Sequence, residues 1–262
     1  MNDVSGCQGQ GAAAAYGARH SQSNPLEDGA VAGCMQAGAA MGGAALNELG
    51  ARNSSMPAHF DALHRENADP WGVRSRWYER RKTRLILAAL PREHYGTVFE
   101  PGCSVGGNSV ALAPRCDLLV ASDASALAVE RAREAVVAFP HVRVEQWCLP
   151  WQWPVGRNDL VVVAELAYYL DDEAFDRFIA WVPEALHEGG HLLMCHWRAR
   201  IADACRSGDT VHGAAMQQLN LLHVGAWQDD DMRIDVWQRG GNTSVAAAGG
   251  AQEAAARQGA VA

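Results

Sequence analysis

The stretch that decides the fold runs from Thr97 to Asp123 and reads TVFEPGCSVGGNSVALAPRCDLLVASD. It opens on an apolar run, passes through a turn rich in glycine, and closes on a second apolar run at residues 118–122. Glycine allows a chain to reverse tightly out of a strand and lets the backbone approach a ligand closely. A short continuous apolar run is typical of a parallel strand buried on both faces. The stretch therefore predicts a β–loop–α–β module whose loop binds a ligand.

The spacing of the loop glycines separates two classes of cofactor. Gly102, Gly106 and Gly107 follow a G-x-x-x-G-G pattern, whereas dinucleotide-binding loops follow G-x-G-x-x-G. A pyrophosphate also has no use for an acid such as Glu100 at the end of the strand. S-adenosylmethionine has no phosphate and carries a cationic amine, which an acid beside the loop suits. We therefore predict an S-adenosylmethionine site that is formed here by Glu100, Gly102, Ser104 and Gly106.

Asp123 adds a second acid to this site. It stands 23 positions after Glu100, at the end of the second predicted strand. A carboxylate in this place can accept hydrogen bonds from both hydroxyls of a ribose. The alternative roles are structural, with Glu100 capping a helix and Asp123 serving as the N-cap of a helix that begins at Ala126. Two acids in register at the ends of neighbouring strands favour the nucleoside cofactor.

Strands and helices alternate along the rest of the chain, and an acidic turn at 228–231 joins the last two apolar runs as a hairpin. Strands are expected at 97–100, 118–122, 142–145, 159–164, 191–196, 221–224 and 233–237, and helices at 75–90, 126–139 and 173–186. This order predicts an α/β fold of the doubly wound, Rossmann-like class I methyltransferase type. Its sheet is expected to be seven-stranded and mostly parallel, with a C-terminal antiparallel hairpin.

Composition divides the chain into segments. Residues 1–55 and 241–262 are dominated by small and polar residues, with too few large apolar side chains to offset the entropy of ordering. We expect both segments to be disordered. Residues 56–240 form the predicted S-adenosylmethionine-dependent methyltransferase domain, which is large enough to hold a sizeable core.

Charge and composition argue against several classes of partner. The formal net charge is −8, and no concentrated basic face accompanies it, so a nucleic acid is not expected. The basic run at 74–84 is typical of the solvated face of a helix. No stretch approaches the roughly 20 apolar residues of a membrane helix, and the first residues lack the features of a secretory signal. The seven cysteines are irregularly spaced and suggest no zinc site. We expect a cytoplasmic protein, monomeric or homodimeric, that binds no metal.

Several runs of this sequence resemble the nodulation protein S family of S-adenosylmethionine-dependent methyltransferases. The likeness extends from about Asp69 to Arg198 and rests on Asp69-Pro-Trp71, Arg81, EPGCSVGG at 100–107, LAPRC at 112–116, FPHVRV at 139–144 and VVVAELAYYLDD at 161–172. The resemblance implies N-methylation of the free amine on a deacetylated chitooligosaccharide, as in nodulation factor synthesis. It also implies, together with position, that Arg81 pairs with the carboxylate of the cofactor.

Two stretches depart from the family pattern. After the third strand, where an acid commonly meets the adenine amino group, the chain has Gln146-Trp147-Cys148. Stacking on Trp147, or a backbone group at Trp147 or Cys148, is expected to replace that acid. The runs HWR at 196–198 and GDTVH at 208–212 also fall outside the family pattern, which leaves room for a different acceptor.

The acceptor side of the site is expected around the fourth strand. Glu165 follows this strand and would face the methyl group, as a cofactor contact or as the base that takes a proton from an ammonium. Tyr168 would stack on a sugar or supply a hydroxyl. His196, at the end of the fifth strand, is the alternative base. The competing interpretations are that Glu165 caps a helix and that His196 packs in the core.

The remaining candidates would contact the acceptor. Trp71 precedes the first strand, where methyltransferases of this architecture often place a lid, although core packing explains it equally well. Arg198 would hold a carboxylate or phosphate of the acceptor, and a surface ion pair is the alternative. Asp209 and His212 are weaker candidates of the same kind.

The residues alone leave two other functions open. One is transfer of the methyl group to nitrogen or oxygen of a different small metabolite. The other is a protein that binds S-adenosylmethionine without catalysis, which formation of S-adenosylhomocysteine would exclude. A nicotinamide enzyme is disfavoured by the loop spacing. In each case the expected partner is a small molecule.

Overall fold

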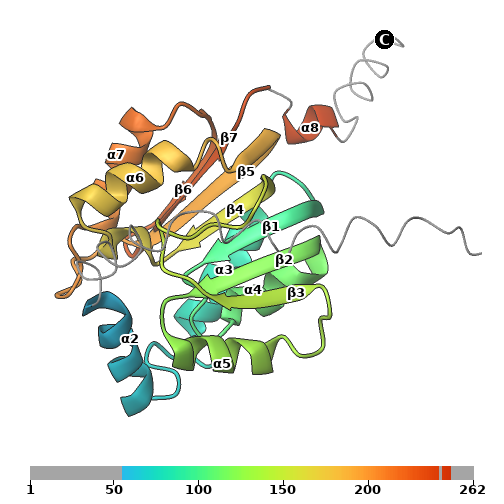
Figure 1. Ribbon diagram of the computed structural model, residues 1–262. Helices are drawn as coiled ribbons and strands as arrows, with labels where there is room; N and C mark the ends of the chain where they lie inside the picture. Colours follow the sequence, from blue (N-terminus) through green and yellow to red (C-terminus); the bar gives the residue numbers. More distant parts are fainter. Residues whose placement is uncertain (1–54, 242–243, 249–262) are drawn as a thin grey trace, which may run out of the picture. The chain divides into compact units, whose positions relative to one another are not determined.

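The structure is a computed structural model, and it describes residues 55–241 and 244–248. These residues contain a seven-stranded sheet with the strand order β3-β2-β1-β4-β5-β7-β6 (Figure 1). The strands are β1 (Tyr95–Pro101), β2 (Cys116–Asp123), β3 (Val142–Gln146), β4 (Asn158–Ala164), β5 (Leu186–Trp197), β6 (Leu222–Gln228) and β7 (Met232–Gln238). β1 to β5 pair in parallel, whereas β7 is antiparallel to both of its neighbours, β5 and β6.

This strand order confirms the predicted fold class. The chain builds outward from β1 through β2 to β3, and then returns to place β4 on the other side of β1. The carboxyl ends of β1 and β4 therefore lie at the reversal of strand order, where sheets of this type bind ligands. The turn at 228–231 joins β6 to β7 as an antiparallel hairpin, as expected from the sequence.

Helices cover both faces of the sheet. They are α2 (Ser55–Glu66), α3 (Trp77–Ala89), α4 (Gly107–Leu112), α5 (Ala126–Ala135), α6 (Asp172–Trp181), α7 (Gly208–Gln218) and α8 (Val245–Ala248), with short 3-10 turns η3 (Ala113–Arg115) and η4 (Ala167–Tyr169). Successive strand residues point to opposite faces, and β4 follows this rule. Its Leu160 and Val162 pack with α3 and α4, whereas Val161 and Val163 pack with α6 and α7. The apolar run of β4 is continuous because both of its faces are buried.

The helix expected at 173–186 was too long. α6 ends at Trp181, and β5 begins at Leu186. Pro183 explains the early end, because proline has no N–H to continue the helical hydrogen bonds. The helix expected at 126–139 is also shorter, since α5 ends at Ala135. α2 was not predicted.

The segments expected to be disordered, 1–55 and 241–262, lie almost entirely outside the described residues. α8 is a short helix within the second of them, so part of that tail has regular structure. The domain boundaries at 56 and 240 stay a prediction. None of the helices in residues 55–241 and 244–248 has both the length and the apolar character needed to cross a membrane.

Candidate active site

A cavity of about 320 Å³ lies at the carboxyl ends of β1, β2 and β4. The loops that follow β1 to β4 form one side of it, and side chains of α2 and α3 form another. Eight of the predicted site residues line it, namely Trp71, Gly102, Ser104, Asp123, Trp147, Cys148, Glu165 and Tyr168. Its volume suits a small-molecule ligand.

The loop after β1 bends through a series of positive φ angles. Gly102 and Gly106 have φ of 72° and 81°, and Ser104 has φ of 50°. Because non-glycine residues rarely adopt this conformation, Ser104 is a strained position. Its N–H donates to Asp123 Oδ2 at 2.9 Å, whereas its Oγ is buried without a hydrogen-bond partner among the described residues. A polar group of a ligand would supply the hydrogen bond that this hydroxyl lacks.

Asp123 lies on the cavity wall at the end of β2. Its second oxygen, Oδ1, accepts from the Ser125 N–H at 2.9 Å. Burial raises the pKa of this carboxyl, and hydrogen bonds from the Ser125 and Ser104 amides oppose the rise. The N-cap of α5 is Ser125, whose side chain accepts from the Ala128 N–H. The N-cap interpretation of Asp123 is therefore wrong, and Asp123 instead lines the cavity.

Glu100 and Gly106 do not line the cavity, so neither is placed to contact a ligand directly. Glu100 is 2% exposed and accepts a hydrogen bond from Ser109 Oγ at 2.5 Å. Burial, with a smaller contribution from the Asp123 charge, raises the pKa of Glu100 to about 8. Gly106 serves packing: a Cβ at this position would lie 3.2 Å from the Ala132 Cα of α5. Because glycine has no side chain beyond a hydrogen atom, α4 and α5 can pack closely together here.

Trp147 and Cys148 line the cavity from the loop after β3. The Trp147 N–H donates to the backbone oxygen of Asp123 at 3.1 Å, and its half-buried ring packs beside Phe99 with ring centroids 6.3 Å apart. Trp147 therefore lies beside Asp123, the acid that ends β2. This arrangement is the one expected for a base stacked next to a ribose.

Glu165, Lys82 and Glu79 form a charged cluster on the cavity wall, hereafter the Glu–Lys–Glu cluster. Lys82 Nζ lies 2.8 Å from Glu79 Oε2 and 3.1 Å from Glu165 Oε1. Burial lowers the pKa of Lys82, but the two carboxylates outweigh that effect and raise it overall. Sequence reasoning missed Glu79 and Lys82, because they belong to a basic, aromatic run that is typical of a solvated helix face. Only their i, i+3 spacing hinted at a pair.

The other oxygen of Glu165 is also occupied. Glu165 Oε2 accepts from Tyr168 Oη at 2.6 Å and from the Trp197 N–H at 2.9 Å. Burial and the Glu165 charge raise the pKa of Tyr168, so its phenol remains a donor. Tyr78 lies on the same wall, and its buried hydroxyl has no partner among the described side chains. Two phenols and a carboxylate thus face the cavity near the end of β4.

α2 supplies a wall that sequence reasoning did not anticipate. Phe60 lines the cavity and packs against Tyr169 and Trp71, with ring centroids 5.1 Å and 6.2 Å apart. Trp71 is therefore part of this wall. Met56, Phe60 and Leu63 stand at i, i+4 and i+7 in the sequence, a spacing that predicts an amphipathic helix. That signal was available and was hidden by the polar composition around it.

Arg81 does not line the cavity, which corrects the expectation that it pairs with the cofactor carboxylate. Its Nη1 lies 2.7 Å from Asp229 Oδ2, and its guanidinium stacks on the Trp227 ring at 5.0 Å. Both partners belong to the β6–β7 hairpin. Neighbouring positions on a helix point about 100° apart, so Lys82 reaches the cavity while Arg81 reaches the hairpin.

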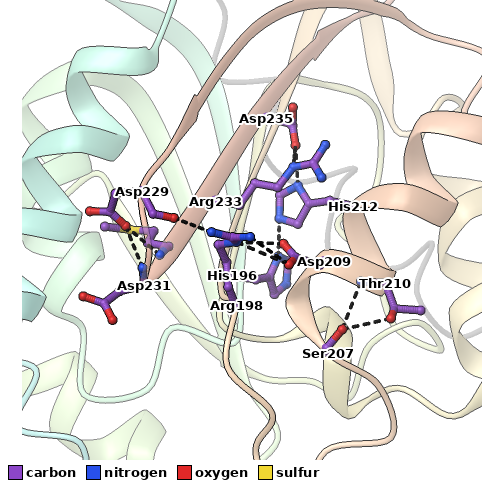
Figure 2. Close-up of polar contacts among 11 residues, drawn as sticks. His196, Arg198, Ser207, Asp209, Thr210, His212, Asp229, Asp231, Arg233 and Asp235 are labelled. Carbon is purple, nitrogen blue, oxygen red and sulfur yellow. Dashed lines mark hydrogen bonds and ion pairs between the residues drawn. The ribbon is translucent and has the colours of Figure 1, made fainter.

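His196 and Arg198 also lie off the cavity wall, and Figure 2 shows their polar contacts. His196 is fully buried, and its Nε2 accepts from the Ala167 N–H at 3.1 Å, so it is a core histidine and not a base that meets a ligand. Arg198 pairs with Asp209 at 3.0 Å and donates to the Asp229 backbone oxygen at 2.6 Å. The ion-pair interpretation of Arg198 agrees with this geometry, and Asp209 is its partner. His212 is buried as well.

Comparison with known families identifies the chain. Residues 58–223 match the family model of Nodulation protein S (NodS). The chain belongs to the nodulation protein S family. Nodulation protein S of Sinorhizobium fredii (strain NBRC 101917 / NGR234) is 29% identical over 206 residues, which cover 71% of this chain and 92% of that protein. Nodulation protein S of Rhizobium tropici is 31% identical over 142 residues, and here the match spans 52% of this chain and 58% of that protein.

Solved structures agree with this membership. The N-methyltransferase NodS from Bradyrhizobium japonicum WM9, in complex with S-adenosyl-L-homocysteine, is 27% identical and has a TM-score of 0.62 over 69% of this chain and 97% of that chain. A Pseudomonas syringae protein assigned as a methyltransferase is 45% identical, with a TM-score of 0.57 over 63% of this chain and all of that chain. This member of the nodulation protein S family is an S-adenosylmethionine-dependent methyltransferase, and the family resemblance seen in the sequence is confirmed.

The cavity of this family member fits S-adenosylmethionine. The cofactor carries an amino acid end, ribose hydroxyls and adenine, and the wall offers the unpartnered Ser104 Oγ, the Asp123 carboxylate and the Trp147 ring in that order along the ends of β1, β2 and β3. When bound, the cofactor supplies an electrophilic methyl group on a sulfonium.

Proposed function

We propose that this chain methylates the free amine of a deacetylated chitooligosaccharide. Its relative from Bradyrhizobium japonicum is named an N-methyltransferase, which supports nitrogen as the acceptor atom. The observation that carries the proposal is the Glu–Lys–Glu cluster on the cavity wall. Two carboxylates around one ammonium leave a net negative charge, which attracts a cationic amine and repels an anionic acceptor.

Glu165 is the residue that we assign to the acceptor amine. Lys82, Tyr168 and the Trp197 amide all donate to it, and these donors fix the position of its carboxylate. A carboxylate held in this way binds an ammonium and can take its proton, which frees the lone pair for attack on the methyl carbon. Holding the nitrogen in line with the methyl group supplies most of the rate. The phenol of Tyr168 is assigned to hydrogen bonding with the sugar.

Trp71 and Tyr168 are the aromatic side chains that we assign to the saccharide. Both lie on the cavity wall, and Trp197 extends this aromatic surface outward, since it lines the cavity and is 42% exposed. Arg198 is not part of this assignment, because its guanidinium is already held by Asp209 and Asp229. Glu100, Gly102, Ser104, Gly106, Asp123, Trp147 and Cys148 are assigned to the cofactor side, Glu100 and Gly106 acting through the shape and charge of the loop.

The test is methylation of matched oligosaccharides. Purified protein with S-adenosylmethionine is given a chitooligosaccharide with one free amine, or the same oligomer fully N-acetylated. We expect S-adenosylhomocysteine and a product heavier by one methylene only with the free amine, as measured by mass spectrometry. Equal turnover with both oligomers would contradict the proposed amine acceptor, and turnover with neither would favour another small metabolite methylated at nitrogen or oxygen.

The proposal includes the setting in which the enzyme works. We propose that residues 56–240 form the catalytic domain, and that it acts in the cytoplasm as a monomer or homodimer. The irregular cysteines support a reducing compartment. Light scattering of the full chain at assay concentration measures the oligomeric state.

A further inference from the structure

A buried chain of hydrogen bonds runs from β7 to η4, the turn that carries Tyr168. Figure 2 shows the part of this chain from Asp235 through His212 to His196. Asp235 Oδ2 lies 2.7 Å from His212 Nδ1, and His212 Nε2 lies 3.0 Å from His196 Nδ1. His196 Nε2 lies 3.1 Å from the backbone N of Ala167, the first residue of η4. We call this chain the histidine relay. It links β7, α7, β5 and η4, and it uses two residues, His196 and His212, that the family resemblance did not explain.

The last contact determines which nitrogens carry protons. The Ala167 N–H can only donate, so His196 Nε2 is an acceptor and His196 carries its proton on Nδ1. That proton points to His212 Nε2, which is then an acceptor, and His212 donates from Nδ1 to Asp235. Burial lowers the pKa of both histidines, and both are 0% exposed, so both rings are neutral. The donor and the acceptor of every hydrogen bond in the relay are therefore assigned.

The relay has a fixed anchor in β7. Asp235 is 1% exposed and also contacts Arg233 Nε at 2.6 Å and His223 Nε2 at 2.8 Å. These neighbours hold the carboxylate in place, so His212 cannot turn away without leaving a buried charge short of a partner. The anchor lies on the hairpin, and the far end of the relay lies beside the cavity.

The end at Ala167 matters because its N–H begins a 3-10 turn and has no partner within that turn. Three consecutive residues of β5 hold this segment: Cys195 O accepts from the Glu165 N–H at 2.9 Å, His196 accepts from Ala167, and the Trp197 N–H donates to Glu165 Oε2. Glu165 has φ of 56°, an unfavourable conformation that persists only where its surroundings enforce it. His196 is the only side chain among these three partners.

We propose that His196 and His212 are positioning residues for methyl transfer: the histidine relay caps η4 and thereby holds the Glu165–Tyr168 pair against the cavity. The His196 ring also packs on Tyr168, with ring centroids 5.1 Å apart. Neither histidine lines the cavity, so their effect on the reaction passes through η4. The role in catalysis rests on the proposed acceptor, whereas the capping of η4 does not.

The first test uses hydrogen exchange in the complex with S-adenosylhomocysteine. His196→Asn removes the acceptor that faces Ala167, whereas the longer His196→Gln can place an amide oxygen near the position of Nε2. His191→Asn is the matched control, since His191 is a buried histidine of the same strand that contacts Tyr95. We expect exchange in a peptide spanning 165–170 to accelerate at least about tenfold in His196→Asn, and to stay within about threefold of wild type in the other two variants. Unchanged exchange in His196→Asn would overturn the proposal.

The second test measures turnover with the free-amine chitooligosaccharide. We expect His196→Asn to lower kcat by roughly 10- to 100-fold, the scale of a small misplacement of reacting groups, with KM for S-adenosylmethionine unchanged. His196→Gln should restore most of this loss, and His191→Asn should have wild-type kcat at a temperature where it is folded. Equal kcat in His196→Asn and His191→Asn would contradict the positioning role.

Two outcomes separate the proposals. If wild-type protein does not methylate the oligosaccharide, the proposed acceptor fails, and the exchange experiment still decides whether the relay caps η4. If His196→Asn does not fold, His212→Leu breaks the relay one bond further from Ala167. We then expect a smaller but measurable rise in exchange at 165–170, and wild-type exchange there would overturn the proposal.

Discussion

Glu165 is the residue on which backbone strain and polar contacts converge. Its φ of 56° lies in the left-handed region, and its side chain accepts from Lys82, Tyr168 and the Trp197 amide. Strain of this kind is maintained at functional sites because the surrounding contacts determine the conformation. The proposed role of Glu165 depends on the charge of its carboxylate more than on the shape of its side chain.

Replacing Glu165 by Gln tests that charge. Glu165→Gln keeps the size of the side chain but cannot bind an ammonium by charge or take its proton, so we expect kcat to fall about 100-fold, at the low end of the usual effect of a lost acid or base. The affinity for S-adenosylhomocysteine should stay within about threefold of wild type, because the carboxylate is assigned to the acceptor. Turnover assays and calorimetry measure the two quantities, with the exposed Glu173→Gln as control. A parallel loss of affinity would instead assign Glu165 to the cofactor.

Glu100 makes stability depend on pH. Burial raises the pKa of its carboxyl from 4.5 to about 8. An unfolded chain releases this proton near pH 4.5, whereas the folded protein without cofactor holds it up to about pH 8. The folded state therefore binds more protons in this window, and the contribution of Glu100 to stability is lost as pH rises through it.

Glu100→Gln should remove this dependence. The amide cannot ionise, so we expect the fall in unfolding free energy between pH 4.5 and 8 to become shallower than in wild type. Urea unfolding without cofactor, at a series of pH values, provides the measurement. Glu173→Gln should keep the wild-type slope, and a Glu100→Gln slope equal to that of wild type would show that the buried acid is already ionised.

At the scale of elements, α3 serves two neighbours with adjacent residues. Lys82 and Glu79 face the cavity, whereas Arg81 contacts Asp229 and Trp227 of the hairpin. The helix therefore connects the Glu–Lys–Glu cluster to the antiparallel edge of the sheet. A sequence pattern could indicate that α3 is a helix, but it could not indicate which of its basic side chains is buried.

Arg81→Ala tests whether Arg81 serves the hairpin and not the cavity. Because Arg81 does not line the cavity, we expect the affinity for S-adenosylhomocysteine to change less than about twofold. About a third of its side chain is exposed, so loss of the ion pair should cost no more than about 1 kcal/mol of stability. Calorimetry and urea unfolding measure these effects, and Asp229→Ala is the matched variant. Binding weakened more than about tenfold would return Arg81 to the cofactor site.

At the scale of the whole molecule, the sheet was predictable because each strand can be recognised from a short run of neighbouring residues. Apolar runs such as that of β4 are continuous where both faces are buried, and the loop glycines mark the first crossover. Three residues predicted for the cofactor site, Ser104, Asp123 and Trp147, line one cavity because each lies at the end of a strand or in the loop after it. The family was predictable as well, because its motifs are contiguous runs of residues.

The Glu–Lys–Glu cluster and the histidine relay were less predictable because they depend on contacts between residues distant in sequence. Lys82 meets Glu165 across 83 positions, and His196 meets His212 through a helix that follows a polar loop. His196 and Arg198 looked like ligand-binding residues in the sequence, since exposure cannot be read from residue type. Only the folded chain shows that one is buried and the other is already paired.

The position of α2 has a consequence for the speed of the cycle. Its Phe60 closes one side of the cavity and packs against Trp71 and Tyr169, and hydrogen bonds also join the helix to Ser125, Arg131 and Asp203. A helix of this length has little stability of its own. Spent donor must leave and fresh donor must enter in every cycle, so we expect the rate at which α2 moves aside to limit turnover. An enzyme built in this way is expected to show a burst of product in its first cycle, followed by a slower steady rate.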